Sequence, residues 1–133
     1  MIRSLAFNAF FYLGTLLAAV VGIVLVPIPT PVVLRGLLHH WARAVVWGMR
    51  WIGGMKVEFR GLEHLPAAGP ALLAGKHHSE CDGILLATRV PGIAFVAMQE
   101  IFRYPLIGAI LYRLQMIRDD TCGGGKEREN LAQ

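Results

Sequence analysis

The sequence predicts an α/β fold in which a membrane-associated N-terminal helical hairpin precedes the first part of an α/β domain. Two observations point to the hairpin: a long apolar run without charge, and a second helical pattern beyond a cluster of prolines. A third points to the domain, because short apolar runs typical of strands alternate with helical patterns after residue 55. We therefore assign residues 1–55 to membrane-anchoring helices and residues 56–133 to the N-terminal portion of the domain.

The N-terminal apolar run has the length and composition of a transmembrane helix. Residues 5–26 read LAFNAFFYLGTLLAAVVGIVLV, and no charged residue lies between Arg3 and Arg35. At about 1.5 Å per residue this helix spans roughly 33 Å, the thickness of a bilayer's hydrocarbon core. The run continues past Ala18 and Ala19 into further valines, whereas a signal peptide has a shorter apolar region that ends in a cleavage site. We expect a retained anchor; the alternative is a buried helix of a soluble protein.

A second helix is expected over residues 32–55. Pro27, Pro29 and Pro31 end the first helix, because proline lacks an amide hydrogen and disfavours helical geometry in the residue before it. At 100° per residue, one narrow stripe of the second helix is basic and consists of Arg35, His39, Arg43 and Arg50. The rest of its surface is apolar and includes three tryptophans, which is typical of a helix among lipid headgroups. The alternative is that the apolar face packs against the α/β domain.

Strand and helix patterns alternate in the second half of the chain. KVEFR predicts a strand at residues 56–60, and the apolar run ALLAG predicts a buried strand at residues 71–75. Further on we expect a helix over residues 79–90, a second buried strand over 92–98, and a helix over 104–114 that is opened by Pro105. This order implies that at least part of the sheet is parallel. No basic stripe with exposed aromatic residues lies outside the lipid-like segment, so we expect no nucleic-acid partner.

Reactive side chains gather in GKHHSECDG, residues 75–83, between the buried strand and the next helix. Ser79 and Asp82 fit the Ser-x-x-acid capping signature, with Ser79 at the N-cap. His77 and Asp82 can converge at the carboxyl end of the strand, where α/β sheets commonly hold ligands. A neutral imidazole can accept a hydroxyl proton, and a carboxylate on its other nitrogen fixes the tautomer and stabilises the imidazolium.

Three other interpretations of this segment stay open. Ser79 and Asp82 can serve only as helix caps, with the histidines as loop residues. A metal site is disfavoured because adjacent side chains diverge and no second group of ligands follows, so we expect no metal. Cys81 as a nucleophile is disfavoured by its two acidic neighbours, Glu80 and Asp82.

The order of these motifs resembles that of the glycerolipid acyltransferases, in particular the bacterial 1-acylglycerol-3-phosphate acyltransferases. His77 and Asp82 match the family's H-x4-D signature. GLEHLP, residues 61–66, is similar to the lead-in to its strand, and QEIFRYPLIGAILYRLQMI, residues 99–117, is similar to its second block. The resemblance covers residues 56–117, with a looser likeness in the membrane segment.

The resemblance implies acyl transfer in phospholipid synthesis, with His77 as general base and Asp82 as its orienter. The donor would be acyl-CoA or acyl carrier protein, and the acceptor a lysophospholipid such as lysophosphatidic acid. No cofactor or metal is implied, and the enzyme would contact membrane lipid at the cytoplasmic face of the inner membrane. Met98 and Gln99 stand where the family usually has a lysine, so no substrate-binding residue is assigned.

The family's Phe-Pro-Glu-Gly-Thr-Arg block has no match here and would follow the last residue. We therefore expect a C-terminally truncated chain, the front part of a longer enzyme, with little or no activity alone. The alternative from another class is a small membrane-anchored structural or binding protein in which the His/Asp motif only begins a helix.

Overall fold

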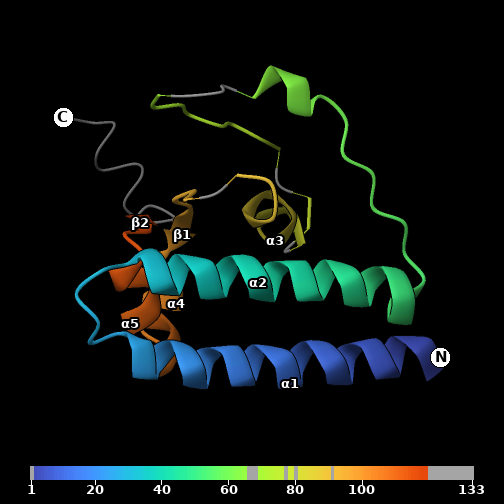
Figure 1. The fold of residues 1–133 in the computed structure, drawn as a ribbon, viewed down its shortest axis with the longest axis horizontal. Coiled ribbons are helices and arrows are strands. Elements are labelled where there is room, and N and C mark those ends of the chain that lie inside the picture. The colour runs from blue at the N-terminus through green and yellow to red at the C-terminus, as the bar shows by residue number, and fades with distance from the viewer. Residues whose placement is uncertain (1, 66–68, 77, 80, 91, 120–133) are drawn as a thin grey trace, which may run out of the picture.

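Two long antiparallel helices dominate the computed structural model, which describes residues 2–65, 69–76, 78–79, 81–90 and 92–119. Helix α1 (Ile2–Leu25) lies along α2 (Val32–Gly48), and α3 (Cys81–Ala87) packs on the opposite side of α2 (Figure 1). The helices and strands formed by residues 96–119 lie near the turn between α1 and α2. The described part of the chain is therefore mostly helical.

The predicted helical hairpin is present, and its three prolines lie in the turn between α1 and α2. The helices approach closely where the Phe10 ring lies against Gly48, a position at which a Cβ atom would collide with the ring. About two turns earlier on α2, the Trp41 ring contacts α1 through the Phe11 ring, and their centroids are 6.3 Å apart. The second helix ends earlier than expected, because its last turn is a π-helix, η1 (Met49–Gly53).

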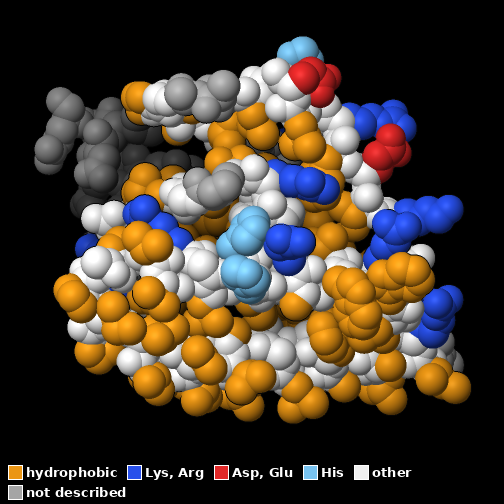
Figure 2. Space-filling model, in the orientation of Figure 1, with side chains coloured by type: hydrophobic (Ala, Val, Ile, Leu, Met, Phe, Trp, Pro, Cys, Tyr) orange, Lys and Arg blue, Asp and Glu red, His pale blue; other side chains and the backbone are white. Residues whose placement is uncertain are grey.

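The outer side of α1 is a continuous apolar surface. Judged by length and composition, α1 is long and apolar enough to cross a membrane, and only 6% of its most apolar window is buried. Figure 2 shows the apolar side chains as a band along this edge of the molecule. A core helix of a soluble protein would bury most of such a surface, so this degree of exposure disfavours that alternative.

A β-α-β unit forms the C-terminal part of the described chain. Strand β1 (Val96–Met98) is followed by α4 (Gln99–Phe102), α5 (Pro105–Arg113) and β2 (Ile117–Asp119). The two strands pair in parallel, with Val96 opposite Ile117 and Met98 opposite Asp119. The predicted parallel pairing and the helix that begins at Pro105 are confirmed. However, β1 is shorter than expected and is exposed at Val96 and Met98 instead of buried, and β2 was not predicted.

Two predicted strands are absent from the described residues. Residues 56–60 are extended, and exposure alternates along them as predicted, but they pair with no strand there; a short 3₁₀ turn, η2 (Leu62–His64), follows. Residues 71–75 are extended and exposed instead of buried, and Leu72 is 94% exposed. A strand forms only where a neighbour takes up its amide and carbonyl groups, and within the described residues neither segment has one.

Candidate active site

The turn that opens α3 is held by the two capping residues expected from the sequence. The Ser79 Oγ atom accepts a hydrogen bond from the Cys81 amide at 3.2 Å. In return, the Asp82 Oδ2 atom accepts one from the Ser79 amide at 3.0 Å. This reciprocal pattern is a capping box, which satisfies amide groups that the first turn of a helix leaves without partners. The predicted capping roles are confirmed.

Asp82 also fixes the backbone just before the cap. Its Oδ2 atom accepts a second hydrogen bond, from the His78 amide at 2.8 Å. Asp82 as a residue is half-buried, whereas His78 and Ser79 and the two hydrogen bonds to the carboxylate are exposed, so the turn lies at the surface. An ionised carboxylate can accept about four hydrogen bonds, so these two amides do not exhaust its capacity. The carboxylate is held in a defined position from which it can also orient a donor.

The predicted pair of His77 and Asp82 can be described only on the Asp82 side. His77 and Glu80 lie outside the described residues, so the contact between imidazole and carboxylate stays a prediction. The alternative of a metal site also needs His77 and Glu80, so it stays a hypothesis. Among the described residues, no group of three potential metal ligands lies close together. The location differs from the expected one, because the motif follows an exposed extended segment and not the end of a paired strand.

Two residues of the basic stripe of α2 contact other elements. The His39 Nδ1–H group donates to the Ala87 carbonyl oxygen at 3.2 Å, which ties α2 to the end of α3. The Arg35 guanidinium donates to the side-chain oxygen of Gln115 at 3.1 Å. The stripe therefore faces α3 and the residues after α5. Its expected contact with lipid headgroups stays a prediction.

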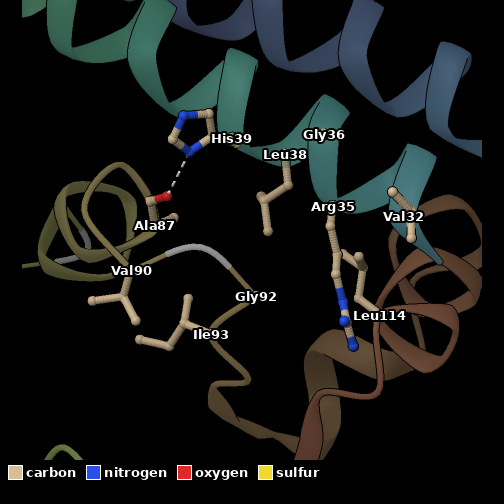
Figure 3. A pocket seen from close by; sticks show the side chains of 10 residues that line it. All are labelled: Val32, Arg35, Gly36, Leu38, His39, Ala87, Val90, Gly92, Ile93 and Leu114. Atoms are coloured by element: carbon tan, nitrogen blue, oxygen red, sulfur yellow. Dashed lines mark hydrogen bonds between the residues drawn. The ribbon is translucent and has the colours of Figure 1, made fainter. Parts of the chain in front are cut away.

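An apolar cavity of about 280 Å³ lies between α2, the segment after α3 and the end of α5. Figure 3 shows Val90 and Ile93 on one side of it and Leu114 and Arg35 on the other, with His39 bonded to Ala87 at its edge. The residues that line it come from separate segments between positions 32 and 114, and they form no motif that could be recognised in the sequence. Sequence reasoning missed this cavity because only the tertiary packing assembles it.

Comparisons with known proteins agree on one family. A family model described as Acyltransferase matches residues 56–132. The 1-acyl-sn-glycerol-3-phosphate acyltransferase of Pseudomonas aeruginosa is 29% identical over 86 residues, which are 65% of this chain and 33% of that protein. The chain thus spans about a third of the length of this relative. No solved structure matches.

Proposed function

This chain belongs to the acyltransferase family, and we propose that its enzyme transfers an acyl group from an acyl thioester to a hydroxyl of lysophosphatidic acid. The named acceptor rests on the likeness to the bacterial 1-acyl-sn-glycerol-3-phosphate acyltransferase. The observation that carries the proposal at the site is the carboxylate of Asp82, which backbone amides hold at the start of α3 within the H-x4-D motif. The match covers about a third of that relative, so the activity, acceptor and donor of the whole enzyme are part of the proposal.

In the proposed reaction, His77 is the general base and Asp82 orients its imidazole. The imidazole takes the proton of the acceptor hydroxyl as the oxygen attacks the thioester carbonyl carbon. The carbon–sulfur bond then breaks, and the imidazolium returns the proton to the leaving thiolate. A well-placed base contributes about a hundredfold to ten-thousandfold in rate, and an orienting carboxylate stabilises the imidazolium that forms.

The exposed surface of α1 and the apolar cavity have separate roles in handling lipid. α1 anchors the enzyme in the membrane, at its cytoplasmic face, where acceptor and product both reside. What supports this role is the exposed apolar surface of α1. The cavity between α2 and the segment after α3 takes part of a fatty acyl chain, because its walls are mainly apolar.

Two histidine variants of the full-length enzyme test the assignment. We expect His77→Ala to lower the rate of acyl transfer by at least about a hundredfold, while the enzyme stays in the membrane fraction. His78→Ala is the matched control, because the neighbouring bond to Asp82 comes from the His78 backbone and survives the change. Acyl transfer that persists in His77→Ala would contradict the proposed mechanism and favour a binding or structural role.

A further inference from the structure

A cationic groove of about 500 Å³ lies beside the apolar cavity, between α2, η1 and the residues after α3. Three arginines line it: Arg43, Arg50 and Arg89. Arg43 and Arg50 are seven residues apart along α2 and η1, so they share a face, and Arg89 reaches the groove from just beyond α3. Figure 2 shows basic and histidine side chains gathered over α2, above the apolar band.

Aromatic rings hold two of these arginines and leave their N–H groups available. The Arg89 guanidinium carbon lies 4.3 Å from the centre of the Phe59 ring, and that of Arg50 lies 5.5 Å from the Trp51 ring. A guanidinium stacked on a ring still presents its edge as a fork of donors suited to phosphate. The groove therefore combines oriented cationic donors with aromatic surface.

The groove has no acidic counterpart of its own. Within the described part of the chain, none of the three guanidinium groups forms an ion pair with a carboxylate. Three cations that line one groove repel one another and raise the local concentration of anions. A bound phosphate would relieve this repulsion and accept several charge-assisted hydrogen bonds.

We propose that this groove binds the phosphates of the nucleotide part of acyl-CoA, with an aromatic wall against the adenine. This inference rests on the proposed function, because it names the acyl donor. Asp82 lies in α3 and Arg89 in the turn that follows it, seven residues further on. At the rise of a helix this separation corresponds to about 10 Å along the chain. In lysophosphatidic acid the phosphate ester and the reacting hydroxyl are on adjacent carbons. While the hydroxyl reacts beside Asp82, this phosphate is therefore too close to the reacting centre to reach the groove. The long pantetheine arm of CoA separates thioester from nucleotide and can bridge this distance.

Binding of free CoA to the full-length enzyme in detergent micelles tests the inference. We expect Arg43→Gln and Arg89→Gln each to weaken CoA binding by about tenfold to hundredfold, the effect of losing a hydrogen bond to a charged group. Arg60→Gln is the matched control. It removes the same charge from an exposed arginine that is paired with Glu58 outside the groove, so its CoA affinity should stay within about twofold of the parent's.

Two further measurements distinguish the possible sources of phosphate. The groove variants should raise the KM for acyl-CoA and leave the KM for lysophosphatidic acid unchanged, and they should bind phosphatidylglycerol vesicles like the parent. Loss of vesicle binding with intact CoA affinity would overturn the inference in favour of a lipid headgroup. An enzyme that transfers acyl groups only from carrier protein and binds no CoA would also overturn it. Binding of free CoA and of vesicles needs no acyl transfer, so these two measurements test the groove separately from the proposed role of His77.

Discussion

Exchanging Ser79 or Asp82 separates helix capping from catalysis, because both residues cap α3 and only Asp82 carries the charge. Ser79→Ala removes the bond from the Cys81 amide to Ser79 Oγ. Loss of an N-cap side chain costs about 1 kcal/mol. Asp82→Asn keeps an oxygen for the amides of His78 and Ser79 but makes both bonds neutral, and neutral bonds are roughly half as strong as charged ones.

The two changes should therefore destabilise α3 to a similar extent, about 1 kcal/mol each at this surface site. Such a loss corresponds to a roughly fivefold larger population of the locally opened helix, and so to about fivefold faster amide exchange. Acyl transfer should respond differently. Ser79→Ala leaves the carboxylate in place and should lower the rate by less than about tenfold, whereas Asp82→Asn should lower it by about a hundredfold or more, because a neutral amide does not stabilise the imidazolium.

Hydrogen–deuterium exchange of peptides that cover α3 measures the opening, and acyl transfer at saturating substrate measures the chemistry in the same preparation. Ser79→Thr is the control, because threonine also caps helices and should restore slow exchange. If the rates of Asp82→Asn and Ser79→Ala lie within tenfold of each other while their exchange is equal, Asp82 is only a cap and its catalytic assignment is wrong.

Three other substitutions test the packing, the cavity and the anchor. A Cβ atom at Gly108 would collide with the carbonyl oxygen of Phe102, so Gly108→Ala should destabilise the enzyme by about 1–3 kcal/mol although alanine has the better helix propensity. Gly14→Ala is the control, because a Cβ at Gly14 has no neighbour within 4 Å. An unchanged Tm of Gly108→Ala would show that the backbone around Phe102 can move aside without loss of stability. Gly36→Leu puts a side chain into the apolar cavity from a position where a Cβ has no neighbour within 4 Å. In a competition assay the variant enzyme should prefer shorter acyl donors than the parent does. An unaltered chain-length profile would place the acyl chain outside this cavity. Leu13→Lys puts a charge at the middle of the exposed face of α1. Losing leucine and gaining lysine should together cost about 3–4 kcal/mol of membrane insertion, so flotation with vesicles should decrease. Undiminished flotation would argue against a spanning α1.

The sequence by itself determined the features that depend on neighbouring residues. The long apolar helix, the proline turn after it, the capping box at Ser79 and the helix that begins at Pro105 all appear where local patterns predicted them. Each depends on the geometry of a few consecutive residues, because helices satisfy their hydrogen bonds within the segment. The capping half of the candidate site was therefore predictable.

Only the tertiary structure decided the features that need a partner from far along the chain. The apolar run at residues 71–75 has the composition of a strand, yet it stays extended and exposed because no described strand lies beside it. In contrast, Ile117–Asp119 is a strand because Val96–Met98 lies next to it. The bond from His39 to Ala87 and the groove lined by both Arg43 and Arg89 likewise bring together residues more than 40 positions apart. Local composition sets which conformations a segment favours, but pairing, cavities and charge clusters exist only where the packed chain brings distant residues together.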